Sequence, residues 1–156
     1  MPVLHLGVID VSYQSPPQRA IGKRRRRKGS SSTKTTGDVA EILEAKYHIF
    51  ELFVQLHGDE IGDDLAESVS GAIESFIMGA PVSLNPFGSA TSKIEDRFKQ
   101  MLSLKELDSL GFPGIPTAAA QRGVNHRFKH PYKKRAARPS FIDTGTFQAS
   151  AKAWVE

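Results

Sequence analysis

The sequence predicts an α+β protein in which a helical hairpin and a further helix are flanked by short β-strands at both termini. Alternating apolar residues at 3–13 and again at 146–155 indicate the two strands. Between them, apolar residues recur every three or four positions, which is typical of amphipathic helices. The predicted segments are an N-terminal strand (1–17), a basic Ser/Thr-rich arm (18–37), a helical core (38–110), an extended basic segment (111–140), and a turn with a C-terminal strand (141–156).

Length and composition favour a single domain without a membrane span. The chain has 156 residues, 39% of them hydrophobic, and no cysteine, which excludes disulfides and Cys-based metal sites. No apolar run approaches the roughly 18 residues that a transmembrane helix needs. The apolar start MPVLHLGVIDV also lacks the preceding basic residues of a secretory signal. We therefore expect a soluble protein with no membrane partner.

The N-terminal strand is followed by a strongly basic arm. Pro16 and Pro17 end the strand, because proline cannot donate a hydrogen bond to a β-ladder. The arm contains KRRRRK and then a Ser/Thr-rich stretch, and neither has an apolar pattern that could bury a core. We predict that the arm forms a subunit contact against an acidic surface of another copy or another protein, through Arg24, Arg25, Arg26, Arg27 and Lys28.

The first two helices are expected to form an antiparallel hairpin with acidic outer faces. Asp38 and Glu41 fit a capping box, which predicts a helix that begins there and ends at Gly58. A second helix is predicted from about Asp59 to Gly79. Because almost nothing separates the two helices, they should pack against each other.

A third helix and a basic segment follow. Ser92 and Glu95 fit another capping box, and the predicted helix ends at Gly111. Residues 82–84 are compatible with a short strand before it, and residues 117–123 with two helical turns after it. The sequence HRFKHPYKKRAARP then indicates an extended basic segment.

The C-terminal segment combines a turn with a strand. Asp143 and Thr144 can hydrogen-bond their own backbone, and Gly145 tolerates a positive φ, so the triplet predicts a tight turn. The strand should pair with residues 3–13 or with a strand of a neighbouring subunit. One face carries the apolar side chains of Phe147, Ala149, Ala151, Ala153 and Val155. Trp154 lies on the opposite face.

Charge is segregated along the chain although its net value is only +4. Residues 1–36 carry +7, residues 37–80 carry −9, residues 81–112 are neutral, and residues 113–156 carry +6. Complementary patches of this kind can fix the register of neighbouring subunits. They can equally pair within one chain, with the basic ends folded against the acidic helices.

The sequence does not favour an enzyme. The triplet Asp143 to Gly145 also occurs in aspartic proteases, but those need a second Asp and a β-rich body, whereas only eleven residues follow Gly145 here. His126 and His130 lack a nearby carboxylate, and Pro131 disfavours the helix that would bring them together. GKRRRRKGSSSTKT lacks the spacing of a phosphate-binding loop. We expect no catalytic residues, no metal site and no cofactor.

Nucleic-acid binding is the alternative function. KRRRRK and HRFKHPYKKRAAR offer phosphate contacts, and Phe128 or Tyr132 could stack on bases. The charge of −9 on residues 37–80 would repel the same polyanion. We therefore place nucleic acid second to protein as the predicted partner.

The last 46 residues, GFPGIPTAAAQRGVNHRFKHPYKKRAARPSFIDTGTFQASAKAWVE, resemble the C-terminal region of small structural virion proteins of tailed bacteriophages. PSFIDTG followed by an aromatic residue, Ser150, Lys152 and Trp154 carries most of the similarity, and it also resembles head–tail connector and tail-completion proteins. The resemblance implies a neck, tail or baseplate protein of the virion, assembled in the bacterial cytoplasm. Its partners would be other copies and other virion proteins, with Phe147 and Trp154 among the contact residues.

Overall fold

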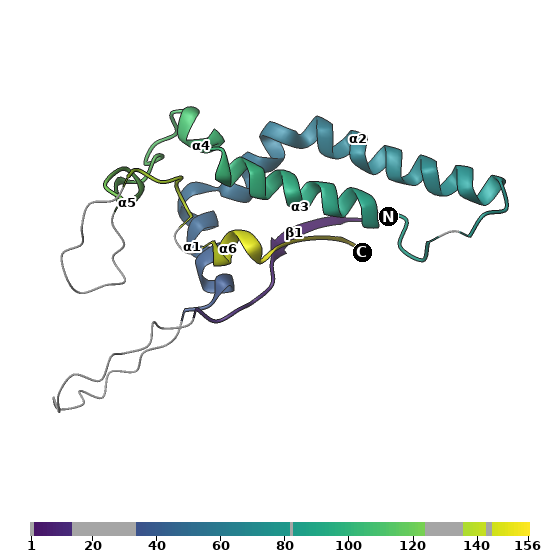
Figure 1. Ribbon diagram of the computed structural model, residues 1–156, viewed down its shortest axis with the longest axis horizontal. Helices are drawn as coiled ribbons and strands as arrows, with labels where there is room; N and C mark the ends of the chain where they lie inside the picture. The colour runs from purple at the N-terminus through teal and green to yellow at the C-terminus, as the bar shows by residue number, and fades with distance from the viewer. Residues whose placement is uncertain (1, 14–33, 82, 124–135, 143–144) are drawn as a thin grey trace, which may run out of the picture.

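Two long helices lie beside a two-stranded sheet that the two ends of the chain form together (Figure 1). The computed structural model describes residues 2–13, 34–81, 83–123, 136–142 and 145–156. Its elements are β1 (Leu4–Val8), α1 (Thr36–Tyr47), α2 (Ile49–Ile77), α3 (Gly88–Ser103), α4 (Glu106–Ser109), α5 (Ala118–Gln121), α6 (Thr146–Ala149) and β2 (Ala151–Val155). The predicted α+β class with a strand at each end is therefore confirmed.

The chain turns between α1 and α2 at His48, ten residues before the predicted stop at Gly58. His48 adopts the left-handed conformation (φ 51°, ψ 44°), which histidine enters more readily than most residues. The Glu44 carboxylate then accepts a hydrogen bond from the Phe50 amide at 2.8 Å, which satisfies one free donor at the start of α2. Gly58 lies inside α2 instead, because one exposed glycine costs a helix only about 1 kcal/mol.

Two predicted capping boxes are corrected. Thr35, not Asp38, caps α1: its hydroxyl accepts from the Asp38 amide, while the Asp38 carboxylate accepts from the Thr35 amide. The third helix begins at Gly88 rather than Ser92, and Ser92 Oγ donates to the Gly88 carbonyl within the helix. At α1 the predicted capping box is displaced by about one helical turn, whereas α3 has no side-chain cap at its N-terminus.

The helical hairpin is formed by α2 and α3, not by the two segments on either side of Gly58. Phe53 and Phe98 meet edge to face, with ring centroids 5.2 Å apart. Further along, Arg97 and Lys93 of α3 pair with acidic residues of α2 at successively higher positions, so the two helices run antiparallel. The connection between them spans residues 78–87, and no strand occurs in the part of 82–84 that the structure describes.

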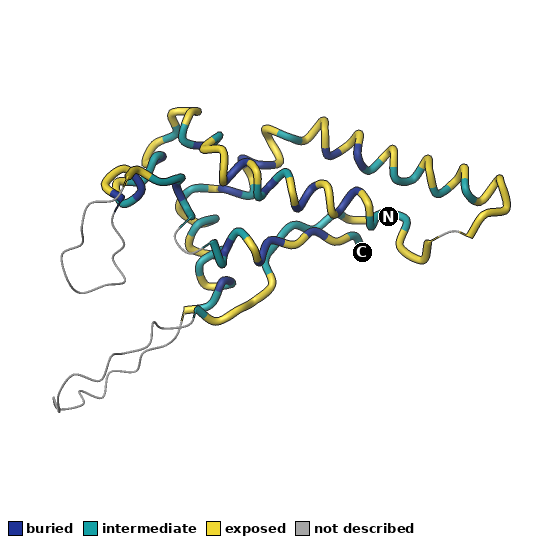
Figure 2. Tube along the Cα trace, viewed as in Figure 1, coloured by how far each residue is buried: buried dark blue, intermediate teal, exposed yellow. Residues whose placement is uncertain are grey.

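The core lies where the first half of α2, α3 and the terminal sheet converge. Phe50 joins these parts, since its ring stacks on Phe98 at 5.2 Å and approaches Phe147 at 6.4 Å. Figure 2 shows the buried positions gathered in this region. The buried cluster consists of Ile49, Leu52, Phe53, Ile61, Ile94, Phe98, Met101, Leu102, Leu107, Ile115, Phe147, Ala151 and Ala153.

The second half of α2 extends away from this core (Figures 1 and 2). Beyond Ile61 none of its apolar side chains is buried, although the sequence predicted an apolar stripe that continues to its end. The exposed fractions of Ile73, Phe76, Ile77 and Met78 are 53%, 75%, 76% and 83%. Within the described structure, these side chains therefore have no apolar cover.

Candidate functional site

The terminal sheet is the first candidate for a subunit contact. β1 and β2 are antiparallel, with Leu6 opposite Ala153 at the centre of the ladder. Leu4, Leu6 and Val8 pack on the core together with Ala151 and Ala153, whose exposed fractions are 3% each. The prediction that the C-terminal strand pairs with residues 3–13 and covers a helix with small apolar groups is confirmed.

At the outer edge of β2, one backbone amide is bound by a buried carboxylate of α3. Val3 and Glu156 exchange both backbone hydrogen bonds, so the amides of alternate residues, including Ala153, point away from β1. Glu95 Oε1 accepts from the Ala153 amide at 3.2 Å and pairs with Lys152 Nζ at 2.8 Å. The sequence did not predict this contact of Glu95, because the spacing of Glu95 from Ser92 suggested a helix cap.

The outer edge of β1 has no comparable closure. By the same alternation, the amides of Leu4, Leu6 and Val8 point away from β2. Among the described residues, no hydrogen bond is donated by these three amides outside the ladder. β1 therefore presents an open edge to which a further strand can be added.

The outward face of the sheet carries an aromatic pair. The rings of His5 and Trp154 stack with centroids 5.3 Å apart, and Trp154 Nε1 donates to Glu156 Oε1. Gly7 makes room for the indole, since a Cβ there would lie 3.3 Å from Trp154 Cη2. Trp154 is 40% exposed on the face opposite the core, as predicted, and its role as a subunit anchor stays a prediction.

The turn before β2 is followed by a helical segment that the sequence reading did not anticipate. Gly145 has a φ of 77°, so the predicted positive φ is confirmed, while Asp143 and Thr144 lie outside the described residues. Residues 146–149 form α6 rather than strand, and Phe147 is buried in the core with 3% exposure. Phe147 therefore stabilises the fold of its own chain, which corrects its assignment to a subunit interface.

The ends of the basic arm are held together by a small polar cluster. Arg24 to Lys28 lie outside the described residues, but the Tyr13 amide donates to the Lys34 carbonyl at 3.1 Å and Ser12 bridges Thr35. The fully buried Thr36 donates from its hydroxyl to the Ile9 carbonyl at 2.6 Å. Hydrogen bonds from Thr35 and the Gly37 amide lower the pKa of Asp10 below its ordinary value. The residues that flank the segment with the basic run, Tyr13 and Lys34, thus lie side by side.

The two ionisable networks between α2 and α3 have structural roles. Arg97 Nη1 lies 3.1 Å from Asp64 Oδ2, close enough for an ion pair although the two atoms are not aligned as a hydrogen bond. Hydrogen bonds to Glu67 and Asp64 raise the pKa of Lys93. His57 lies between two carboxylates, with Nδ1 2.8 Å from Glu60 and Nε2 3.2 Å from Glu106. The pairs of Lys93 and Arg97 fasten the second half of α2 to α3, where no apolar side chain of α2 is buried, and His57 links α2 to Glu106 of α4.

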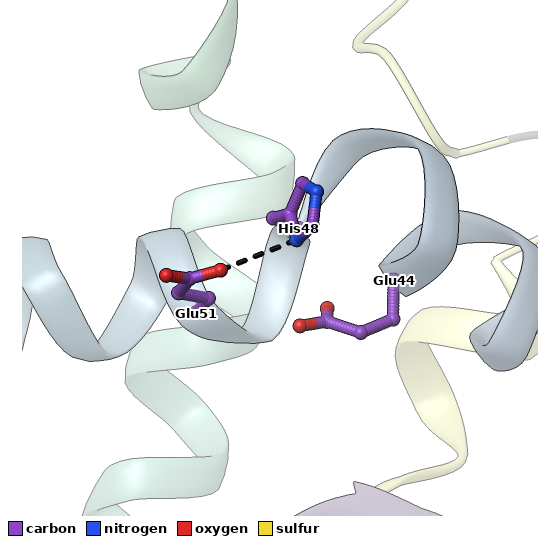
Figure 3. A group of neighbouring side chains, drawn as sticks. All are labelled: Glu44, His48 and Glu51. Atoms are coloured by element: carbon purple, nitrogen blue, oxygen red, sulfur yellow. Dashed lines mark ion pairs between the residues drawn. The ribbon is translucent and has the colours of Figure 1, made fainter.

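Glu44, His48 and Glu51 form the group of side chains best placed to hold a metal ion (Figure 3). Their donor atoms lie within 4.8 Å of one another. Each side chain nevertheless has a task at the α1–α2 junction, because Glu44 accepts the Phe50 amide and His48 Nδ1 pairs with Glu51 at 3.2 Å. The geometry is therefore explained by the helix junction itself.

Comparison with known proteins identifies no relative of this chain: no family model, no curated protein and no solved structure matches it. In the part of the chain that the structure describes, no helix has the length and apolarity needed to cross a bilayer.

Proposed function

We propose that this chain is a non-enzymatic structural protein of a tailed-phage virion, at the neck, tail or baseplate, where it is present in several copies. It joins neighbouring subunits through its terminal strands and its basic segments. The observation that carries the proposal is the open outer edge of β1, whereas on the outer edge of β2 Glu95 binds the Ala153 amide.

The asymmetry between the two edges supports strand addition at β1. An unpaired edge is a template for association, and proteins that do not use such an edge usually cover or disrupt it. Here the α3 carboxylate binds the central outward amide of β2, while the outward amides of Leu4, Leu6 and Val8 accompany side chains that pack on the core. A strand from a neighbouring subunit would satisfy these amides without rearranging the core.

Charge supports contacts between copies. The described residues carry nine Lys/Arg and sixteen Asp/Glu, a net charge of −7. The segments 14–33 and 124–135 carry the other twelve Lys/Arg and no acidic residue. A negative body with two positive segments is complementary to copies of itself, and complementarity favours correct register over wrong contacts.

The resemblance to virion proteins supports the proposal that the chain belongs to a phage virion. It is carried by PSFIDTG and the strand that follows, and in the structure Gly145 begins the short helix that delivers Ala151–Val155 to the sheet. The motif therefore has a defined structural use, which is to place the last strand beside the first.

Amide hydrogen exchange tests the strand contact. The amides of Leu4, Leu6 and Val8 should exchange fast in dilute protein and slowly in the assembled particle, whereas His5 and Gly7, whose amides face β2, should be protected in both. Mass spectrometry of purified virions should also detect the chain. Equal exchange of the outward amides in both states, or absence from virions, would contradict the proposal.

Nucleic-acid binding is the second candidate, and the concentration of twelve Lys/Arg in two acid-free segments favours it. Binding through phosphates weakens steeply with salt, with a slope close to one per contact. A titration with duplex DNA and with single-stranded RNA at low and high salt separates this function from subunit joining. Lack of binding at low salt would eliminate it.

A further inference from the structure

The last turns of α2 form an exposed apolar surface at one end of the molecule (Figures 1 and 2). We call the side chains of Ile73, Phe76, Ile77 and Met78 the α2 tip. Ile73, Phe76 and Ile77 are spaced by three and four, so they lie on one face of the helix. Each side chain of the α2 tip is more than half exposed. A group of large apolar side chains in water usually marks an interaction site.

The rest of the described chain does not explain this surface. The ion pair of Glu67 with Lys93 and the hydrogen bond from Ser68 Oγ to the Pro86 carbonyl tie the middle of α2 to the elements after it. Beyond Ser68, α2 continues for nine residues to Ile77. This extension keeps its apolar face although packing within the described chain does not require it.

The opposite end of the molecule contains an open groove of about 370 Å³ beside the α1–α2 junction. It is lined chiefly by apolar and aromatic side chains, with polar groups at the rim. The lining side chains relevant here are those of Lys46, Tyr47, Leu52, Phe112, Pro113 and Ile115. A groove of this size and composition suits one or two large apolar side chains.

We infer that the α2 tip of one copy docks in this groove of a second copy, with Phe76 and Ile77 as the anchors. The inference rests on the proposed function as a multi-copy structural protein and adds a specific contact to it. Because the end of α2 and the α1–α2 junction lie at opposite ends of the molecule (Figure 1), the contact is head to tail. A head-to-tail contact closes into a ring or continues as a filament, according to the rotation between copies.

The unpaired charges near the α2 tip and near the groove are of opposite sign, which also favours a contact between these two surfaces. Along α2 there are seven acidic residues and no Lys or Arg. Of these, Glu74 lies within the segment of the α2 tip and makes no ion pair with any described residue, whereas Asp59 and Asp63 lie farther from the tip.

At the groove end, the ammonium groups of Lys46 and Lys105 and the guanidinium of Arg122 are likewise without a carboxylate partner in the described ranges. The nearby carboxylates of Glu51 and Glu106 are already engaged by His48 and His57. Glu74 beside an approaching α2 tip therefore meets unpaired cations, whereas two tips would bring Glu74 against Glu74, which favours the head-to-tail orientation over tip-to-tip association.

Cysteine cross-linking tests the contact on a chain that has no cysteine of its own. Ile77→Cys places a thiol on the α2 tip, and Gln55→Cys places one on the exposed rim of the groove. Under mild oxidation, a mixture of the two variants should give a disulfide-linked pair, whereas each variant alone should not. A pair formed as readily by Ile77→Cys alone indicates tip-to-tip association, and no pair in the mixture indicates another occupant; either result overturns the inference.

A charge substitution provides an independent measurement. Phe76→Asp should weaken self-association at least about tenfold, as for loss of an interface anchor, with an unchanged helical circular-dichroism signal. Leu104→Asp is the control, since Leu104 is equally exposed (76%) but lies outside both surfaces, and it should leave association unchanged. Equal loss in both variants would overturn the specific contact. If the contact of the α2 tip fails these tests but the outward amides of β1 are protected on assembly, the proposed function stands and only the α2-tip contact is refuted.

Discussion

Both halves of α2 carry apolar residues at helical spacing, but only the first half buries them. From Ile49 to Ile61 the helix buries Ile49, Leu52, Phe53 and Ile61 against α3 and the rest of the core. From Gly62 onward it buries no apolar side chain, and it is fastened to α3 by Lys93 and Arg97. The first half is thus specified by its own chain, whereas the apolar face of the second half is left for a partner.

This difference shows what apolar periodicity does and does not determine. Leu65, Val69, Ile73 and Phe76 continue the helical stripe, so the pattern predicts helix correctly on both sides of Gly58, although the break predicted at Gly58 does not occur. The pattern contains no information on which surface covers the stripe. Because α3 begins only at Gly88, after a ten-residue connection, it does not reach the α2 tip.

The largest expected difference in stability is between two variants, in which a phenylalanine is replaced by alanine in the first half of α2 or in the second. Phe53→Ala removes a fully buried ring and should lower the free energy of unfolding by about 3–5 kcal/mol. Phe76→Ala, at 75% exposure, should change it by less than about 0.5 kcal/mol in dilute monomer. Urea denaturation of the two variants and the wild type measures both values. Similar losses would mean that the second half is also part of the core.

The ionic fastening of the second half should have an intermediate effect. Arg97→Ala deprives the nearly buried Asp64 carboxylate of one of its two cationic partners, and should cost about 1–3 kcal/mol. Asp96→Ala is the matched control, since the neighbouring side chain is 71% exposed and should change stability by less than about 0.5 kcal/mol. Thermal unfolding at low salt compares them. An Arg97→Ala loss no greater than that of Asp96→Ala would contradict a structural role for the ion pairs.

A smaller effect, of opposite sign, is expected at the position predicted to end the first helix. Gly58 lies within α2 and is exposed, and a Cβ at this position would meet no atom outside the helix backbone within 4 Å. Gly58→Ala should therefore stabilise the protein by about 0.5–1 kcal/mol, because alanine loses less backbone entropy in a helix. Destabilisation in a urea titration would indicate a helix break at Gly58 instead.

The smallest effect concerns Glu60, whose pKa is held below its ordinary value chiefly by the hydrogen bond with His57. A lowered pKa in the folded state contributes stability above the ordinary glutamate pKa, and this contribution is lost as pH falls through the lowered value. Wild type should exceed Glu60→Gln in stability at neutral pH, and the difference should vanish in acid. Asp59→Asn, which removes no ion pair, should give a difference independent of pH over the same range. A pH-independent difference for Glu60→Gln would refute the linkage.

The sequence predicted the local features of the fold better than the partners of each element. The strands at both termini, the positive φ of Gly145 and the outward position of Trp154 follow from alternation and turn chemistry, which are local properties. The α1–α2 break at His48 could not be predicted, because it depends on a Glu44 carboxylate that reaches the Phe50 amide.

The candidate surfaces required the three-dimensional arrangement for the same reason. Glu95 binds the Ala153 amide at the β2 edge, and 58 positions of sequence separate the two residues, so no local pattern encodes the contact. The groove joins Tyr47 and Leu52 to residues 112–115, and only the packing of these segments brings them together. Exposure of the α2 tip depends on where α3 begins relative to the end of α2.

Whether the second half of α2 is covered by a partner is tested most directly by amide hydrogen exchange along α2 at a series of protein concentrations. Amides of residues 49–61 should be protected equally at all concentrations, since their cover comes from the same chain. Amides of residues 70–78 should gain protection as concentration rises, in step with those around Tyr47 and Leu52 in the groove. Protection of residues 70–78 that does not depend on concentration would show that the second half of α2 needs no partner, and would contradict docking of the α2 tip on a second copy.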